Sequence, residues 1–238
     1  MILCLDSGNS RLKVGLGGRG DWRERASLAR GDGSGLRALL AQWPRPQRAF
    51  GCNVAGADAA RGIEGALSES GVALTWVAAA REAAGVRSLY DDPSQLGADR
   101  WAALLGARAA HAGACLVVNC GTATTIDVLD AAGVFQGGLI LPGLSLMRSS
   151  LGSATAQLRP APGQVTALPR NTDDAIASGC IAATAGAVLR MFAHIAGQAT
   201  PLCLLCGGAA EALEPHLGLP LRRIDTLVLD GLARFAEG

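Results

Sequence analysis

Aromatic and charged side chains are both scarce in this chain. Aromatic residues make up 4% and charged residues 17% of its 238 residues, and the formal net charge is +1. The basic residues are scattered singly and are not interleaved with aromatics, as they would be in a nucleic-acid-binding groove. No nucleic-acid partner is therefore expected. Half of the residues are hydrophobic, which excludes an intrinsically disordered chain.

A long apolar segment is also missing near the N-terminus. Asp6 interrupts the apolar residues 1–5 before they reach the length of a signal peptide or a membrane span. We therefore expect a soluble cytoplasmic protein with no membrane partner.

The cysteines and histidines give no sign of a disulfide framework or a metal cluster. The seven cysteines are an odd number and lie mostly within apolar runs, which favours reduced thiols used as small hydrophobic side chains. Cys203 and Cys206 have the C-x-x-C spacing, but without a second pair a buried strand is favoured over metal or redox chemistry. The three histidines are isolated in the sequence, so packing or surface roles are favoured over catalysis.

A pattern of strand, polar turn and second strand occurs twice, about half the chain apart. The apolar residues 1–5 and 115–118 are each followed by a polar turn that contains glycine and then by another apolar segment. This repeat predicts an α/β protein with two similar domains that meet at a cleft. The elements expected elsewhere are helices at 35–43, 58–70 and 101–111 and strands at 50–54 and 74–78.

The repeated turn has the composition of a phosphate site. Backbone N–H groups in a tight turn that contains glycine form a concavity for anions, and hydroxyl side chains add donors without adding negative charge. Asp6 has a different task, because a carboxylate would repel phosphate and is better suited to hold hydrated Mg²⁺. Lys13 could offset charge nearby. A single turn of this kind is more often an ordinary β-turn, so the interpretation depends on its recurrence.

These motifs resemble those of a known enzyme family. Residues 6–10 match the first phosphate motif of type III pantothenate kinases, which are similar to Bvg accessory factors. Residues 121–125 resemble the family's second phosphate motif, and residues 97–100 resemble its substrate signature. Several motifs in the right order are far more specific than one. Further matches follow in the same order at residues 137–143, 171–172, 178–179 and 207–208.

The resemblance implies the actin-like ATPase and sugar-kinase fold. In that fold two RNase H-like domains, each a mixed β-sheet flanked by helices, hold ATP in the cleft between them. The expected domains are residues 1–112, with the first phosphate motif and the substrate motif, and residues 113–238, with the second phosphate motif. The resemblance also implies a homodimer. The implied reaction phosphorylates pantothenate with ATP to 4′-phosphopantothenate, the first step of coenzyme A biosynthesis.

The resemblance assigns roles to individual residues, and most have a structural alternative. Asp99 is implied to accept the proton of the substrate hydroxyl, although the local sequence alone favours a helix N-cap. Arg100 could present its guanidinium to the pantothenate carboxylate or be an exposed helix residue. Thr172 of one subunit is implied to contact the substrate bound to the other subunit, but the local sequence also fits a helix N-cap at this position. The residues implied to bind pantothenate are Tyr90, Gly97, Ala98, Asp99, Arg100 and Thr172.

The implied ATP contacts come from both phosphate motifs. Thr122 is expected to face the phosphates, whereas Thr124 and Thr125 could equally be alternating strand residues. Gly207 and Gly208 would allow the backbone to approach the adenosine, although a strand that turns into a helix needs glycine anyway. The residues implied to bind ATP are Asp6, Ser7, Gly8, Asn9, Ser10, Arg11, Leu12, Lys13 and Thr122.

One position departs from the family pattern. Two residues before Gly121 much of the family has an aspartate associated with a monovalent cation, and this chain has Asn119. An amide keeps an oxygen ligand but lacks the charge that holds a hard cation. We therefore expect weak or absent dependence on K⁺ or NH₄⁺. Ser10 replaces a frequent threonine and retains the hydroxyl.

Two other functions remain open at this point. A regulatory protein without catalytic activity could keep the fold and bind nucleotide, because fold alone does not imply function. A kinase for a sugar or another small polyol is the other alternative, because the same fold supports such enzymes.

Overall fold

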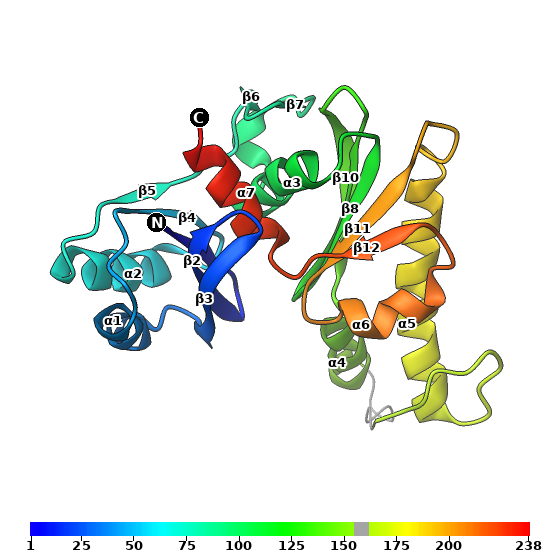
Figure 1. Ribbon diagram of the computed structural model, residues 1–238. Coiled ribbons are helices and arrows are strands. Elements are labelled where there is room, and N and C mark those ends of the chain that lie inside the picture. The colour runs from blue at the N-terminus through cyan, green and yellow to red at the C-terminus, as the bar shows by residue number, and fades with distance from the viewer. Residues whose placement is uncertain (155–161) are drawn as a thin grey trace. The chain divides into compact units, whose positions relative to one another are not determined.

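The computed structural model describes residues 1–154 and 162–238, which form two compact units (Figure 1). Unit 1 contains residues 1–112, 133–136 and 226–238. Unit 2 contains residues 113–132 and, among the described residues, 137–154 and 162–225. The end of the chain therefore belongs to the first unit. The two domains expected at 1–112 and 113–238 stay a prediction.

Unit 1 is built on a five-stranded mixed sheet in the order β3-β2-β1-β4-β5. The first three strands are antiparallel neighbours, whereas β4 is parallel to β1 and β5 is parallel to β4. The parallel pairs need crossover connections, which are the helices α1 (Gly33–Gln42) and α2 (Ala57–Glu69). The strands are β1 (Ile2–Ser7), β2 (Arg11–Gly18), β3 (Asp21–Ala29), β4 (Arg48–Asn53) and β5 (Leu74–Trp76).

The alternation of side chains gives the sheet of unit 1 two different faces. Leu3 and Leu5 lie opposite Leu16 and Val14, and these residues share one hydrophobic core with buried side chains of α1 and α2. Asp6 therefore points to the opposite face, because successive residues of a strand alternate. On that face the sheet is covered by α3 (Ala98–Ala110) and α7 (Leu227–Ala236). The strand alternation thus places a carboxylate beneath the helix that carries the substrate motif.

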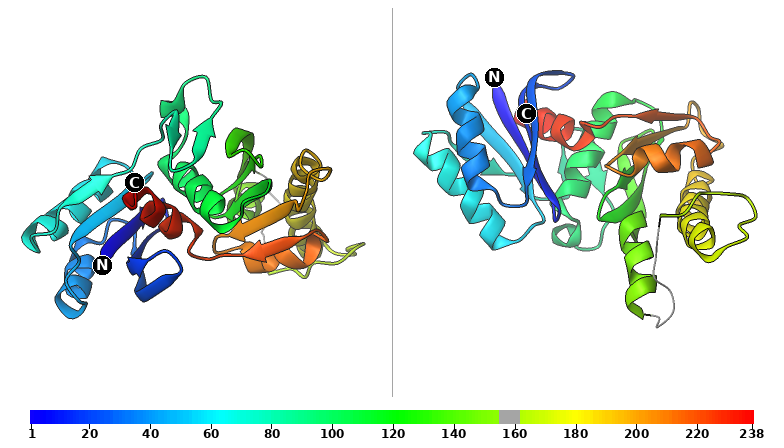
Figure 2. Two further views of the ribbon diagram at one scale, coloured as in Figure 1. Left: turned by 45° about the horizontal axis from the view of Figure 1, so that its top comes forward. Right: turned by 90° about the horizontal axis from the view of Figure 1, so that it is seen from below.

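Helices α3 and α7 lie side by side (Figure 2), and two glycines allow their backbones to meet. A Cβ on Gly231 would lie 1.7 Å from the carbonyl oxygen of Ala102, and one on Gly106 would lie 2.2 Å from that of Leu227. Real Cβ atoms do not approach backbone this closely, so both positions require glycine. The contact fixes the height of α3 on the sheet.

A buried carboxylate ties α7 to the neighbouring hairpin. Asp230 accepts hydrogen bonds from the indole Nε1 of Trp22 and the hydroxyl of Thr226, both at 2.8 Å. The side chain of Trp22 comes from β3, so the helix and the sheet are joined by a satisfied buried polar group.

A small hairpin precedes α3 in unit 1. It consists of β6 (Glu82–Ala83) and β7 (Val86–Ser88), joined by Ala84 and Gly85 with φ angles of 48° and 84°. Two successive positive φ angles are typical of the two-residue hairpin turn that matches the twist of the strands. Strand β7 pairs in parallel with the first residues of β10 (Val134–Pro142), and the short helix η1 (Pro93–Gln95) leads into α3.

Unit 2 repeats the organisation at the start of unit 1. Strands β8 (Cys115–Cys120) and β9 (Ala123–Leu129) form an antiparallel hairpin, and β11 (Leu202–Cys206) is parallel to β8. The strand order is β12-β11-β8-β9-β10, with β12 at Leu221–Arg223. The helices are α4 (Leu144–Ala154), α5 (Thr172–Phe192), α6 (Ala210–Leu213) and η2 (Glu214–His216).

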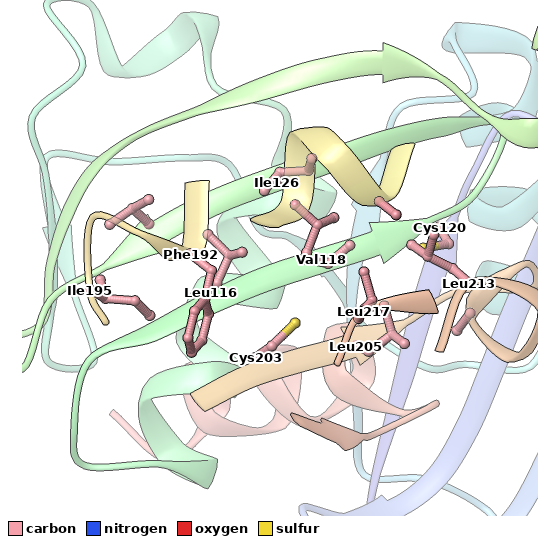
Figure 3. Close-up of a cluster of buried hydrophobic side chains, with 14 of the residues drawn as sticks. Leu116, Val118, Cys120, Ile126, Phe192, Ile195, Cys203, Leu205, Leu213 and Leu217 are labelled. Carbon is pink, nitrogen blue, oxygen red and sulfur yellow. The ribbon is translucent and has the colours of Figure 1, made fainter. Parts of the chain in front are cut away.

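The core of unit 2 lies on one face of its sheet (Figure 3). Leu116, Val118 and Ile126 of the hairpin pack there against Phe192 at the end of α5. Cys203 belongs to the same core, and all seven cysteines are buried thiols, as the sequence predicted. Within the described residues α5 is the single helix long and apolar enough to cross a membrane, by length and composition only, and half of that segment is buried.

The main differences from the expected elements lie at ends and edges. Strand β3 was not predicted, because its exposed and half-buried residues carry no continuous apolar pattern. Helix α3 begins at Ala98, three residues before the expected start at Trp101. The expected helices at 35–43 and 58–70 correspond to α1 and α2.

The glycine contact between α3 and α7 gives a stability test. We expect Gly231→Ala to lower the free energy of unfolding by about 1–3 kcal/mol, because the added Cβ overpacks a backbone contact. Gly65→Ala in α2 is the matched control, since its Cβ would meet nothing within 4 Å and alanine is the better helix former by about 1 kcal/mol. Thermal unfolding checks both variants, and an unchanged midpoint for Gly231→Ala would contradict the close contact.

Candidate functional site

The first expected phosphate turn connects β1 to β2. The Gly8 N–H donates to the Arg11 carbonyl at 3.0 Å, and residues 9 and 10 of the turn are exposed. The backbone at Gly8 does not need a left-handed conformation, and an added Cβ would meet only the Arg11 oxygen at an ordinary 3.4 Å. The glycine therefore contributes an open backbone surface and not a special turn conformation, which differs from the reason assumed from sequence.

Ser7 carries a buried hydroxyl at the end of β1. Its Oγ has no hydrogen-bond partner within the described part of the chain, although the residue is only 1% exposed. A buried polar group without a partner costs about 1–3 kcal/mol. The alternation of β1 places this side chain on the same face of the sheet as Leu3 and Leu5.

Asp6 is the centre of a charged cluster on the α3 side of the sheet. Its Oδ2 lies 3.8 Å from the Lys13 Nζ, and its Oδ1 accepts a hydrogen bond from the Cys52 thiol at 3.7 Å. Burial raises the pKa of Asp6 from 3.8 to about 6; Lys13 opposes this shift, and the negative charge of Asp99 adds to it. The structure therefore brings Asp6 and Asp99 within electrostatic reach of each other.

The donor set fits a hydrated magnesium ion. Asp6 and Asp99 supply two carboxylates, the ligand type that Mg²⁺ uses in proteins. Among residues 1–154 and 162–238, no three His, Cys, Asp or Glu side chains gather as a metal cage. Mg²⁺ does not require such a cage, because it keeps several waters and uses one or two carboxylates together with phosphate oxygens.

The substrate motif forms the first turn of α3. Gly97 is the N-cap, so the alternative of Asp99 as the N-cap is wrong. Asp99 lies one residue inside the helix, beside Ala98, and its Oδ1 accepts a hydrogen bond from the Arg100 N–H at 2.8 Å. A carboxylate in the first turn is stabilised by the helix dipole.

Arg100 is enclosed by aromatic rings. It is only 4% exposed, so the alternative of an exposed helix residue is wrong. Its Nη1 donates to the Tyr90 hydroxyl at 3.0 Å, and its guanidinium carbon lies 5.6 Å from the Tyr90 ring centre and 5.9 Å from that of Phe135. The sequence did not predict Phe135 as a neighbour of Arg100, because it lies on β10, far along the chain, and only the fold brings it close to α3.

The second phosphate turn, in unit 2, is surrounded by close backbone contacts. The Gly143 N–H donates to the Thr122 carbonyl at 2.9 Å, and a Cβ on Gly143 would lie 2.2 Å from the Gly121 oxygen. Gly207 has a φ of 95° and approaches the backbone of Cys120 in the same way. Two further glycine turns therefore pack against the turn that carries Thr122.

Three other expected residues also lie in unit 2. Asn119 ends β8 and is paired across the hairpin with Thr125. Thr124 and Thr125 are both buried residues of β9, as their strand interpretation predicted.

Thr172 is the first residue of α5, and its neighbour Asn171 is the N-cap. The Asn171 Oδ1 accepts from the Asp174 N–H at 2.9 Å. The alternative role of Thr172 as an N-cap is therefore wrong. That threonine is exposed and has no capping task.

Comparison with known proteins agrees with these motifs. Residues 2–194 match the family model of type III pantothenate kinase. The chain is 53% identical over 237 residues to a type III pantothenate kinase of Aromatoleum aromaticum, with 100% of this chain and 98% of that protein covered. A type III pantothenate kinase of an Azoarcus species is also 53% identical, with 99% and 90% covered. The chain belongs to the type III pantothenate kinase family. The family consists of phosphotransferase enzymes, so the expectation of an enzyme is confirmed.

Solved structures support the fold independently. A putative Baf family transcriptional activator from Campylobacter jejuni has a TM-score of 0.62 at 20% identity, covering 99% of this chain and 97% of that one. A putative 2-dehydro-3-deoxygalactonokinase from Sinorhizobium meliloti has a TM-score of 0.59 at 18% identity, covering 100% and 98%. At such identities the likeness concerns the fold alone. The expected actin-like ATPase and sugar-kinase fold is confirmed.

The raised pKa of Asp6 predicts a pH dependence of stability. Between pH of about 4 and 6 the folded protein without ligand binds a proton that the unfolded chain has lost, so stability falls as pH rises through this window. Asp6→Asn should remove this dependence and raise the free energy of unfolding at pH 7 by about 1–3 kcal/mol. Thermal unfolding from pH 4 to 7 measures the effect.

The exposed Asp21 provides the control for this test. Asp21→Asn should leave the pH dependence unchanged. An Asp6→Asn protein that is less stable than the wild type at pH 7 would show that the Lys13 pair outweighs the burial of the carboxylate.

Proposed function

We propose that this chain transfers the γ-phosphoryl group of ATP to the hydroxyl group of pantothenate, giving ADP and 4′-phosphopantothenate. The observation that carries the proposal is the family match over residues 2–194, in a chain whose Asp6 and Asp99 lie within electrostatic reach. The reaction breaks the bond between the γ-phosphorus and the bridging oxygen of ADP. It forms a bond between that phosphorus and the pantothenate oxygen.

Asp99 is the catalytic residue of this proposal. It accepts the proton that the pantothenate hydroxyl loses as its oxygen bonds to phosphorus. The proton leaves late in a loose transition state, so a correctly placed carboxylate is sufficient. Support comes from its position in the first turn of a helix whose backbone is held against α7, because proton transfer needs an acceptor at a fixed distance.

We assign the phosphate groups of ATP to residues of both phosphate motifs. Asp6 would hold Mg²⁺ through water, and the ion would supply positive charge that offsets the charge of the phosphates. Support for the first turn comes from Asn9 and Ser10, which are exposed. The residues that we assign to ATP are Asp6, Ser7, Gly8, Asn9, Ser10, Arg11, Leu12, Lys13 and Thr122.

The carboxylate of pantothenate is bound at Arg100. A planar guanidinium suits a carboxylate, and the Tyr90 and Phe135 rings hold its plane in one orientation. We assign Tyr90, Gly97 and Ala98 to pantothenate as well.

We also assign the protein to the cytoplasm. We further propose a homodimer in which Thr172 of one subunit contacts the substrate bound to the other. Support comes from an exposed stripe on α5 formed by Ala175, Gly179, Ala182 and Gly186. Residues three and four apart share a helix face, and small side chains allow a second helix to approach closely.

Pantothenate-dependent ADP release tests the function. Asp99→Asn should lower kcat at least 100-fold, because the amide cannot accept the hydroxyl proton. Asp58→Asn is the matched control, since Asp58 is an exposed carboxylate in the first turn of α2. It should retain the activity of the wild type.

The same assay separates the alternatives. Turnover of a sugar or another polyol in preference to pantothenate would identify a different kinase. Nucleotide binding without turnover, measured by calorimetry, would identify a regulatory protein. An Asp99→Asn variant within a fewfold of the wild-type kcat would remove the role of Asp99.

Asn119 predicts the response to monovalent cations. The wild type should be activated little by K⁺ or NH₄⁺, because a neutral amide holds a hard cation weakly. Asn119→Asp should introduce activation by either ion, and steady-state rates in K⁺ and in a tetraalkylammonium salt measure it. Strong activation of the wild type would contradict the prediction.

A further inference from the structure

The loop between β7 and α3 carries Tyr90, and the Arg81 side chain binds three of the carbonyls on this side of the loop. The Arg81 Nη1 donates to the carbonyls of Ser88 at 3.0 Å and Tyr90 at 2.6 Å, and its Nη2 donates to the carbonyl of Asp91 at 3.0 Å. We infer that Arg81 is a positioning residue for the acid-binding end of the site. The inference rests on the proposed function, because it concerns how Arg100 and Tyr90 are presented to pantothenate.

Only a guanidinium suits this arrangement. It carries five N–H donors in a planar fork, so it can bind three carbonyls from one position. An ammonium group carries its three donors on one nitrogen and cannot span carbonyls that are spread over four residues. The contacts therefore depend on arginine and not on positive charge alone.

The hairpin fixes Arg81 opposite the loop. The Ser88 N–H donates to the Arg81 carbonyl at 2.9 Å, directly beyond the paired strands β6 and β7. Ser88 is fully buried, and its Oγ accepts from the Tyr90 N–H at 3.2 Å. The Leu89 N–H donates to the Phe135 carbonyl at 3.1 Å. Arg81 thus completes a set of contacts that holds the backbone on both sides of Tyr90.

Further hydrogen bonds hold the backbone between Tyr90 and the substrate motif. The Asp92 Oδ1 accepts hydrogen bonds from the Ser94 N–H and hydroxyl at 2.9 and 2.7 Å, which caps η1. The hydrogen bonds from Ser94 lower the pKa of Asp92, and the positive charge of Arg81 has a smaller effect in the same direction. The Leu96 N–H then donates to the Pro93 carbonyl at 3.1 Å, directly before Gly97.

Loss of these contacts should affect one end of the site only. Tyr90 accepts from the Arg100 Nη1 at 3.0 Å, and its ring lies 5.2 Å from that of Phe135. Without Arg81 the loop loses three hydrogen bonds, so Tyr90 no longer orients the guanidinium. The Asp6 cluster and the first phosphate turn belong to other strands and keep their contacts. Pantothenate binding should weaken while ATP binding is unchanged.

The single tyrosine provides a direct measurement. Tyr90 is the only tyrosine of the chain, so protein labelled with 3-fluorotyrosine has one ¹⁹F resonance. In Arg81→Gln we expect this resonance to move toward the position of the unfolded protein. We also expect the KM for pantothenate to rise about tenfold, with the KM for ATP and kcat within about twofold of the wild type. Arg81→Lys should be intermediate.

Arg87→Gln is the matched control, because Arg87 is an exposed arginine on β7. It should change neither the resonance nor the kinetic constants. An unchanged ¹⁹F resonance and KM in Arg81→Gln would overturn the inference. Equal losses in both KM values and kcat, together with a lower unfolding temperature, would also overturn it and assign Arg81 a general structural role.

If Arg81→Gln does not fold, Arg81→Lys is measured in its place. An unchanged ¹⁹F resonance and an unchanged KM for pantothenate in Arg81→Lys would then overturn the inference. A wild type without pantothenate-dependent turnover would reject the proposed function. The ¹⁹F resonance would then still report whether Arg81 orders Tyr90.

Discussion

The candidate site of unit 1 is organised around the buried Asp6 carboxylate, on the face of the sheet that α3 covers. The alternation of β1 sends Leu3 and Leu5 to one core and leaves Asp6 on the other face, where its charge is expensive to bury. A lysine, a thiol and a second carboxylate surround it. The raised pKa that results identifies a place where folding tolerates unfavourable electrostatics, as is common where charged ligands bind.

The other requirement of the site is a helix held at a fixed height above that carboxylate. The close backbone contact between α3 and α7 at Gly106 and Gly231 holds the helix there, because side chains at these positions would separate the two helices. Arg100 then projects from the first turn of α3 into an aromatic enclosure. One rigid helix therefore carries both the proposed proton acceptor and the proposed carboxylate-binding group.

The sequence predicted what depends on local pattern. Alternating apolar residues and polar turns identified both hairpins, and the residues near Asp6 and Asp99 identified the family. Local pattern could not identify Phe135, Arg81 or the α7 contact, because each acts through a neighbour that is distant in sequence or through backbone carbonyls that carry no residue identity. The N-cap interpretations of Asp99 and Thr172 were wrong by one or two residues, which is the usual uncertainty of a helix boundary.

Unit 1 is discontinuous along the chain, and this affects how it can be assembled. Residues 1–112 leave the ribosome well before residues 226–238, whose helix covers the glycine face of α3. Until then the surface of α3 that packs against α7 is uncovered. Unit 1 is therefore completed only when translation reaches α7.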